Sequence, residues 1–372
     1  TASQSEMDTA SQSEMDTASQ SEMDTASQSE MDTASASVED TGTWTGIDTV
    51  DTETGDSATD TEFVIDSDNC VVGTFQITTA LESDAFVGVT CIRGNLTIGP
   101  SAAALDISLP QLTVIDGELY ISRTQGQCAV LLENLTTVTT VAVSYNRSVS
   151  LSVPSLITIE EALAMEGNGV AGEGEIEMDL RSVTEIGAVS MNGNETASFS
   201  VDLGSLKTIR NNLISNGNMG INALKLSNLE TVSGYFLISS ASGLGQLDLS
   251  RLTAAKGGIT ITANEQLADI DMGLLQHSEG TIVIASNPNL ASINLDSLRA
   301  VTLGSFVISM NEKLSTLKLS TLETVDESVF ISENDIFDCD AAEFTDRIQT
   351  PEIAFCENLP NGTCGDAVCP YD

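Results

Sequence analysis

Apolar residues recur along most of this chain with a period close to 23 residues. The anchors of this period are Leu112, Leu135, Leu156, Val183, Leu206, Leu229, Leu252, Leu275, Leu298 and Leu322. The gaps between them are 23, 21, 27, 23, 23, 23, 23, 23 and 24 residues. A fixed period of this length is typical of solenoids, in which each repeat forms one turn and buries its apolar side against the next.

Inside each repeat, apolar residues stand at every second position, as in Ile259 with Ile261 and Ile282 with Ile284. Alternation with period two predicts β-strands, and helices are expected to be rare because Gly or Asn interrupts every helical pattern. The sequence therefore predicts an all-β fold, a parallel β-solenoid of about ten leucine-rich turns of 23 residues. Turns stacked about 4.8 Å apart give a rod on the order of 50 Å long.

Asparagine recurs at the turn that follows the strand. This column contains Asn192, Asn216, Asn264, Asn287, Asn311 and Asn334, with Ser239 and Ser240 in the one vacant place. Asparagine tolerates left-handed backbone, and its amide both donates and accepts hydrogen bonds. Stacked copies are expected to form a structural ladder of hydrogen bonds.

The longest gap lies between Leu156 and Val183 and contains the sequence EGNGVAGEGEIEMD. Two interpretations are open, an inserted loop or a junction between two lobes. We favour the loop, because the period resumes immediately afterwards.

The start of the chain differs in kind from the repeats. Residues 1–32 are four copies of the octapeptide TASQSEMD, and residues 33–69 remain rich in Thr, Ser and Asp. Such a segment has too little apolar surface to offset its chain entropy, so we expect disorder. The predicted organisation is an acidic Ser/Thr-rich low-complexity stalk over 1–69, an L-domain-like solenoid over 70–338, and a cysteine-containing cap and tail over 339–372.

The strong net negative charge of the chain excludes some classes of binding partner. The chain carries 55 acidic and 13 basic residues, a net charge of −42. Residues 1–69 hold 18 acidic residues and no basic ones, so the remaining 303 residues hold 37 acids and 13 bases, a net of −24. This charge repels nucleic acids and anionic membrane surfaces. No apolar run is long enough for direct membrane insertion, and because the chain starts inside a repeat, any signal peptide or anchor is expected to lie outside it.

Seven cysteines cluster toward the two ends of the repeats. The expected pairs are Cys70 with Cys91, Cys339 with Cys356, and Cys364 with Cys369, with Cys128 left over. The alternative is a set of buried free thiols in a cytosolic protein. Five N-x-S/T sequons, which are candidate N-glycosylation sites, accompany the cysteines at Asn95, Asn134, Asn146, Asn194 and Asn361. Together, cysteines and sequons favour a secreted or cell-surface protein.

Several segments carry a family resemblance. LPQLTVIDGELYIS, VPSLITIEEALAM and LSNLETVSGYFLIS resemble the receptor L-domain repeat of the insulin and epidermal growth factor receptor ectodomains, which also builds fungal GPI-anchored cell-wall organisation proteins. The segment that runs from Cys70 past Cys91 to a G-x-L-x-I strand is similar to their first turn, and NDIFDCDAAEFTDRIQTPEIAFC resembles their disulfide cap. The resemblance covers about residues 70–357 and implies a leucine-rich solenoid closed by disulfides.

The chain also departs from the receptors. The sequence shows no cysteine-rich module, transmembrane segment or kinase, so the resemblance does not imply growth-factor signalling. Ten continuous turns are closer in layout to the wall proteins, whose molecular activity the family does not define.

The sequence offers little for catalysis. The only histidine, His277, is expected in an ordinary exposed turn, and zinc-ligand, Walker A and metalloprotease motifs are absent. Polysaccharide-cleaving β-solenoids gather carboxylates or basic groups on one face, whereas here the residues between paired inward strand positions are apolar or neutral. These residues are Tyr120, Ala142, Ala164, Ser190, Leu237, Thr260, Val283, Val307 and Phe330. We therefore expect no enzyme activity and no cofactor.

One outward column does carry charge, at Lys225, Asp248, Asp271, Asn294 and Lys318. The spacing places Asp248 beside Asp271, where the two carboxylates repel each other. A divalent cation between them is one interpretation, and a solvated column with compensating lysines is the one we favour. The stretch from Asp60 to Asp68 lacks the glycine and the last glutamate of an EF-hand, so only weak calcium binding is expected.

Two functions fit these features. The first is a non-catalytic extracellular structural or adhesive protein of a cell surface, wall or matrix, in which the stalk spaces a rigid rod. The second is a ligand-recognition ectodomain that binds an extracellular protein or glycan on one face of the solenoid. The first is favoured, because the aromatic candidates for a binding patch are only Tyr120, Tyr235 and Phe236, the last in an inward position.

Overall fold

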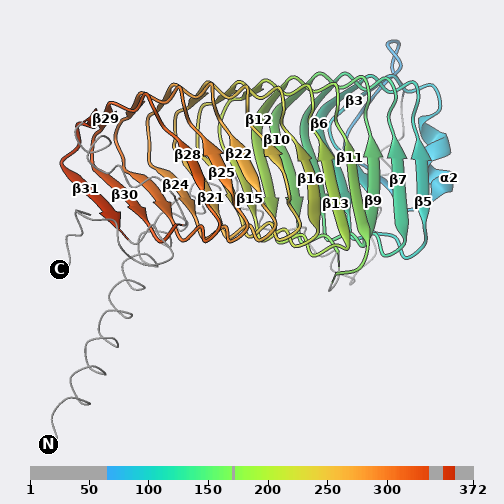
Figure 1. The fold of residues 1–372 in the computed structure, drawn as a ribbon. Helices are drawn as coiled ribbons and strands as arrows, with labels where there is room; N and C mark the ends of the chain where they lie inside the picture. The colour runs from blue at the N-terminus through green and yellow to red at the C-terminus, as the bar shows by residue number, and fades with distance from the viewer. Residues whose placement is uncertain (1–64, 170–171, 335–346, 357–372) are drawn as a thin grey trace, which may run out of the picture. The chain divides into compact units, whose positions relative to one another are not determined.

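The computed structural model describes residues 65–169, 172–334 and 347–356. Almost all of these residues belong to short strands and turns that follow one another along one axis (Figure 1). Neighbouring strands pair in parallel from the first turn to the last. The predicted parallel β-solenoid is confirmed, and it has more turns than the ten anchors indicate, because strands also precede Leu112 and follow Leu322.

One sheet runs the whole length of the solenoid and has 21 strands. Four turns contribute one long strand each: β6 (Val114–Ser122), β8 (Thr137–Ser144), β10 (Thr158–Glu166) and β12 (Glu185–Asn192). The other turns contribute two pieces each: β1 (Cys70–Val72) and β2 (Phe75–Ile77), β3 (Cys91–Arg93) and β4 (Leu96–Ile98), β14 (Thr208–Ile209) and β15 (Leu213–Asn216), β17 (Thr231–Val232) and β18 (Phe236–Ser239), β20 (Ala254–Ala255) and β21 (Ile259–Thr262), β23 (His277–Ser278) and β24 (Ile282–Ala285), β26 (Ala300–Val301) and β27 (Phe306–Ser309), β29 (Thr324–Val325) and β30 (Ser328–Ser332). The last strand is β31 (Glu352–Cys356). We call this sheet the main sheet.

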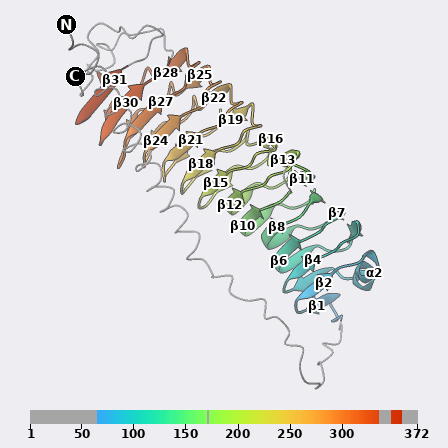
Figure 2. The ribbon, with the colours of Figure 1, turned by 90° about the horizontal axis from the view of Figure 1, so that it is seen from below.

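The opposite side carries two smaller sheets. The six-stranded sheet contains β5 (Leu105–Ser108), β7 (Gln127–Leu131), β9 (Ser148–Ser152), β11 (Glu175–Asp179), β13 (Ser198–Asp202) and β16 (Ile221–Lys225). The four-stranded sheet contains β19 (Leu247–Asp248), β22 (Asp269–Asp271), β25 (Ser292–Asn294) and β28 (Thr316–Lys318). Figure 2 shows the main sheet and the smaller sheets as two rows of strands.

The space between the sheets is filled by one cluster of aliphatic and aromatic side chains that extends from Val71 to Ile348. All ten predicted anchors belong to it and are at most 2% exposed. Inward strand residues stack in register, so that Ile259 lies between Phe236 and Ile282. Each buried layer is therefore enclosed by two others, which makes the stability of a solenoid largely a nearest-neighbour property.

Buried asparagines stack at the corner that follows the main sheet. In a typical step, Asn287 Oδ1 accepts the backbone N–H and the Nδ2–H of Asn264 at 3.0 and 3.1 Å. The ladder contains Asn146, Asn168, Asn194, Asn218, Asn264, Asn287, Asn311 and Asn334. The residue before each of them has left-handed backbone, with φ from 53° at Met310 to 65° at Gly217. This conformation turns the asparagine side chain inward.

The predicted asparagine column is right at four positions and wrong at two. Asn192 and Asn216 end strands β12 and β15 and are partly exposed, whereas the ladder uses Asn194 and Asn218, two residues later. These turns contain two asparagines with nearly equal spacing, so the period alone does not show which one turns inward. The vacant place is held by Ala241, which directly follows the predicted serine pair.

The longest gap between anchors is a loop within one continuous solenoid. β10 and β12 pair directly in the main sheet, and β9 pairs with β11 on the opposite side. Gly174, at the end of this loop, has a φ of 91°, and a Cβ added to it would lie 1.8 Å from the carbonyl oxygen of Arg147. Glycine is thus needed for the extra residues to leave and rejoin the stack without disturbing its register.

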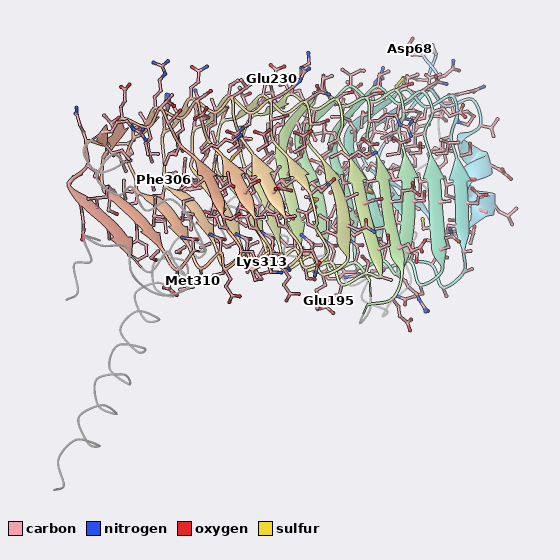
Figure 3. All side chains as sticks on the ribbon, in the orientation of Figure 1. Asp68, Glu195, Glu230, Phe306, Met310 and Lys313 are labelled. Atoms are coloured by element: carbon pink, nitrogen blue, oxygen red, sulfur yellow. A yellow bond between two sulfur atoms is a disulfide. The ribbon has the colours of Figure 1, made fainter. Side chains whose placement is uncertain are left out.

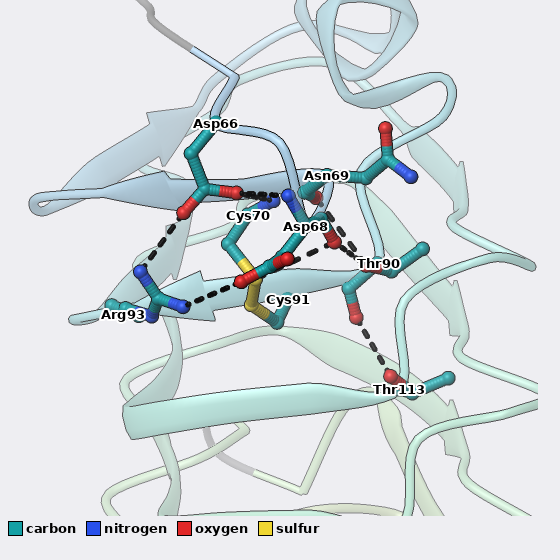
Figure 4. The surroundings of a disulfide bond; sticks show 8 residues. All are labelled: Asp66, Asp68, Asn69, Cys70, Thr90, Cys91, Arg93 and Thr113. Carbon is teal, nitrogen blue, oxygen red and sulfur yellow. Dashed lines mark hydrogen bonds and ion pairs between the residues drawn. A yellow bond between two sulfur atoms is a disulfide. The ribbon is translucent and has the colours of Figure 1, made fainter.

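A disulfide between Cys70 and Cys91 closes the first turn (Figure 4). The two cysteines are direct partners on β1 and β3. Asp66 supports this corner, because its carboxylate accepts the N–H of Cys70 at 2.9 Å and lies 2.9 Å from Arg93 Nη1. The hydrogen bond from Cys70 is the leading cause that lowers the pKa of Asp66, and Arg93 lowers it further.

A short helix, α2 (Ala80–Ser83), and a 3₁₀ turn, η1 (Asp84–Phe86), follow β2 at the first turn. Phe86 is buried and packs edge-on against Phe75, with ring centroids 5.6 Å apart. Within the described ranges, no helix has the length and apolar character required to cross a membrane. The predicted stalk up to residue 64 and the predicted bridges of Cys339 with Cys356 and of Cys364 with Cys369 lie outside the residues whose side chains are described.

Candidate ligand-binding face

The main sheet presents a surface without charged side chains over strands β15, β18, β21, β24, β27 and β30. Its outward residues form three parallel rows, because alternate residues of a strand point outward and the strands pair in register. The first row is Asn212, Tyr235, Gly258, Thr281, Ser305 and Ser328; the middle row is Ile214, Leu237, Thr260, Val283, Val307 and Phe330; the third row is Asn216, Ser239, Thr262, Ala285, Ser309 and Ser332. We call these three rows the uncharged face.

The middle row is almost entirely aliphatic or aromatic. Ile214 and Leu237, on neighbouring strands, are 9% and 8% exposed although they point outward. Val283, Val307 and Phe330 continue the row on the next strands and are partly exposed. The result is an apolar strip, one residue wide, that crosses the strands.

Hydroxyl and amide groups accompany this strip on both sides. In the first row, Ser328 Oγ donates to Ser305 Oγ at 3.0 Å, and Tyr235 is 47% exposed. In the third row, Thr262 Oγ1 donates to Ser239 Oγ at 3.1 Å. These hydrogen bonds run between adjacent strands and order the side chains that form them. In the third row, Ser239, Ser309 and Ser332 are at most 5% exposed, so its accessible polar side chains are Asn216 and Thr262.

Charged side chains border the uncharged face, and one of them reaches its first row, where the Glu327 carboxylate accepts the Ser305 hydroxyl at 3.1 Å. Glu230 and Glu195 project from the two edges at which the chain turns (Figure 3). On the earlier strands of the main sheet, by contrast, outward positions include Glu118 and Glu166. A chain with 55 acidic residues therefore has none of them at the outward positions of this face.

The earlier strands carry a different surface, around Tyr120 and Tyr145. Tyr145 is 50% exposed, and its ring lies so close to Gly167 that a Cβ added there would be 2.7 Å from it. The carboxylate of Glu166 is the main cause that raises the pKa of Tyr145, and burial adds to it. Burial also raises the pKa of Glu118, whose Oε1 is buried without a hydrogen-bond partner in the described part of the chain.

Comparisons with models of protein families, with curated proteins and with solved structures give no match.

Asp248 and Asp271 lie side by side on paired strands β19 and β22, as their spacing predicts. Each carboxylate is engaged close by, because Asp248 Oδ1 accepts the Ser250 hydroxyl at 2.7 Å and Asp271 Oδ1 accepts Asn294 Nδ2–H at 2.8 Å. In the described ranges, no three His, Cys, Asp or Glu side chains gather in a way that suits a metal ion. Asp248 therefore stabilises its own turn, and Asp271 is linked to the neighbouring strand. This geometry gives no support to a cation between the two carboxylates.

His277 lies in the short strand β23, not in a turn as expected. Its ring is 53% exposed, and Nε2 is 3.5 Å from a carboxylate oxygen of Glu279. Its partners on the neighbouring strands are Ala254 and Ala300, whose methyl groups offer no polar chemistry.

Two of the five candidate glycosylation sites are closed in the folded chain. Asn146 and Asn194 are 1% and 0% exposed, and their Nδ2 atoms donate to ladder partners and to backbone carbonyls. A glycan on either nitrogen is incompatible with this packing. Asn134 is exposed and Asn95 is partly exposed, so both remain candidates, whereas Asn361 lies outside the described residues.

Cys128 is a free thiol, in agreement with its expected lack of a partner. It is fully buried in the core opposite Leu105 and Val149, its partners on β5 and β9. Burial raises the pKa of this thiol to about 11. Cys128 therefore stays protonated and acts as a small apolar side chain.

The sequence indicates most of the middle row but not its surroundings. The inward position of Phe236 is confirmed, and Tyr235 and Tyr120 do face outward. Tyr145 and the two flanking rows are not evident from local patterns. A signal for Tyr145 exists, because it directly precedes the ladder residue Asn146, and the residue before each ladder asparagine is left-handed and at least partly exposed.

Proposed function

We propose that this chain is a non-catalytic extracellular structural or adhesive protein of a cell surface, wall or matrix. The observation that carries the proposal is the unbroken core from Val71 to Ile348, because such a stack is a stiff element suited to spanning a distance or presenting a surface. The Cys70–Cys91 disulfide supports an oxidising compartment. The buried leucine anchors and the disulfide-closed first turn also support our proposal of a leucine-rich repeat of the receptor L-domain type.

Antibody labelling of the native source cells tests this proposal. An antibody against the solenoid should label intact cells or their surrounding matrix, while an antibody against a cytosolic protein should require permeabilisation. Mass spectrometry of unreduced native protein should find Cys70 joined to Cys91. Labelling only after permeabilisation, together with free thiols at both positions, would refute an extracellular role.

The second candidate function is ligand recognition by one face of the solenoid. The uncharged face favours it, because a partly exposed apolar strip with polar groups on both sides is typical of surfaces that bind macromolecules. The two functions are compatible, since an adhesive protein needs a surface that recognises its matrix.

A further inference from the structure

The uncharged face combines two chemical features that sugars also combine. Its apolar middle row is flanked by polar groups, such as Tyr235 and Thr281 on one side and Asn216 and Thr262 on the other. In many pyranose rings, C–H groups form the flat faces and hydroxyl groups form the edges. Apolar faces gain by packing on apolar side chains, and edge hydroxyls need hydrogen-bond partners once water is displaced.

We propose that the uncharged face binds a neutral polysaccharide chain lying along the middle row, across strands β15 to β30. This inference rests on the ligand-recognition function and names its ligand class. The C–H faces of successive sugars contact Val283, Val307 and Phe330, the partly exposed apolar members of the row. The hydroxyl edges face the exposed side chain of Tyr235 in the first row and the partly exposed Asn216 and Thr262 in the third.

The dimensions of the face suit one extended chain. Six strands about 4.8 Å apart give a row roughly 24 Å long, and three rows spaced by two residues are roughly 13 Å wide. The flat area is then roughly 300 Å², well below the about 800 Å² that each partner contributes to a standard protein complex. A single polysaccharide chain needs only such a strip.

Charge selects a neutral ligand over other occupants. A polyanion would be repelled by the net negative charge of the chain. A second copy of this chain would bring its own net charge of −42, so association face to face would work against both the charge and the small area. An uncharged polysaccharide is not repelled by the negative charge and needs only a small contact area. When it binds, no unpaired charge is buried on the face.

Cosedimentation of the full chain with insoluble polysaccharides tests the proposal. Microcrystalline cellulose and chitin are the neutral probes, and calcium-free polygalacturonate gel is the acidic one. We expect binding to at least one neutral probe and none to polygalacturonate. Val307→Glu places a carboxylate in the middle of the strip and should weaken binding by at least about tenfold, because the charge would be buried without a partner.

Leu274→Glu is the matched control. Leu274 is 52% exposed and lies in the turn between β22 and β23, away from the uncharged face. The same apolar-to-carboxylate change should alter binding by less than about twofold there. Val307→Thr keeps the shape of the side chain without adding charge and should weaken binding by about two- to fivefold. This variant tests the apolar contact even if Val307→Glu does not fold. Circular dichroism and thermal midpoints check the fold of each variant.

The proposal fails if neither neutral probe retains the protein, or if Val307→Glu and Leu274→Glu lose binding equally. It also fails if sedimentation velocity shows a dimer that Val307→Glu dissociates while no polysaccharide binds, because the face would then join two copies of the chain. None of these results removes the structural or adhesive function, which depends on the cell labelling. A negative labelling result, in turn, would leave the binding measurements intact.

Discussion

The turns from Leu105 to Lys225 and the turns from Leu247 to Lys318 share the main sheet but differ on the opposite side. The first region has strands of four or five residues there, and the second has strands of two or three. SVSLS and SFSVD alternate with period two throughout, whereas NEQLADIDM and NPNLASINL begin with steps of three, as does the segment NMGINALKL that contains β16 at the end of the first region. Inward residues of a strand are two apart, so in the second region a spacing of three means that the chain turns before the strand begins. The main sheet thus sets the register, and the opposite side follows its own pattern.

The junction between the two regions, from β16 to β19, lacks both strand pairing on the side opposite the main sheet and an asparagine in the ladder. β16 and β19 belong to different sheets, and Ala241 stands where other turns have a ladder asparagine. The N–H of Asn218 therefore receives no acceptor from position 241, unlike the N–H of Asn264, which is bound by Asn287. Ser215 Oγ accepts Asn218 Nδ2–H at 2.9 Å, which offsets only part of the loss. The main sheet and the core carry most of the connection across this junction, and two corner hydrogen bonds add to it, from Ser242 Oγ to the Met219 carbonyl and from Thr253 Oγ1 to the Glu230 carbonyl, both at 2.9 Å.

Leucine-to-alanine changes in each region give the largest expected effect. Leu156 in the first region and Leu252 in the second are both fully buried, so each change should leave a cavity and cost about 2–5 kcal/mol. Chemical denaturation measures the cost, and hydrogen exchange should show the loss of protection mainly in the adjoining turns. A much smaller cost for Leu252→Ala would mean that the second region is more loosely packed, and a uniform loss along the chain would rule out the stacked-turn description.

Changes in the asparagine ladder should act with opposite signs in the two places. Asn287→Ala removes the acceptor for the Asn264 N–H and the donor to the Ile261 carbonyl, and should destabilise by about 1–3 kcal/mol. Ala241→Asn supplies the missing acceptor for Asn218 and should stabilise by about 1 kcal/mol. Thermal midpoints of the two variants measure both effects. A destabilising Ala241→Asn would show that the junction has no room for an amide.

Glycines that stack along the second region should be intolerant of side chains. A Cβ added to Gly280 would lie 2.8 Å from the carbonyl carbon of Gly257, so Gly280→Ala should cost about 1–3 kcal/mol as the turns separate. Gly245→Ala is the matched control in the same region, because the nearest atom to its added Cβ is 3.9 Å away. Denaturant midpoints compare the two. Equal costs would mean that close approach of the backbones does not limit the spacing of the turns.

The smallest effect is expected for Asp248→Asn. It removes a carboxylate beside Asp271 but keeps an oxygen that accepts hydrogen bonds from Ser250, so stability should change by less than about 0.5 kcal/mol, with a slight gain at low salt. Thermal midpoints at low and high salt should show this gain fading as salt screens the repulsion. If added calcium stabilised the wild type and not this variant, the cation interpretation would replace ours.

The architecture of the solenoid follows from the spacing of residues in the sequence. A spacing near 23 residues returns each anchor to the same place in successive turns, which is why residues such as Leu156 and Leu252 are buried. The spacing of 21 residues between Cys70 and Cys91 is close to that period, so the two cysteines meet on adjacent strands. Local alternation likewise predicts the strands, because inward and outward positions are decided by neighbours within one strand.

Which side chains meet between turns depends on how the turns stack in the folded protein. Asn194 and not Asn192 enters the ladder, because the left-handed residue before Asn194 turns it inward, and the sequon at Asn146 is closed for the same reason. The uncharged face also exists only between turns. Val283 and Val307 belong to different repeats, and they form one surface because parallel pairing brings them side by side. The pattern within one repeat does not show which outward residues lie side by side, since the residues in contact are one full turn apart in the sequence.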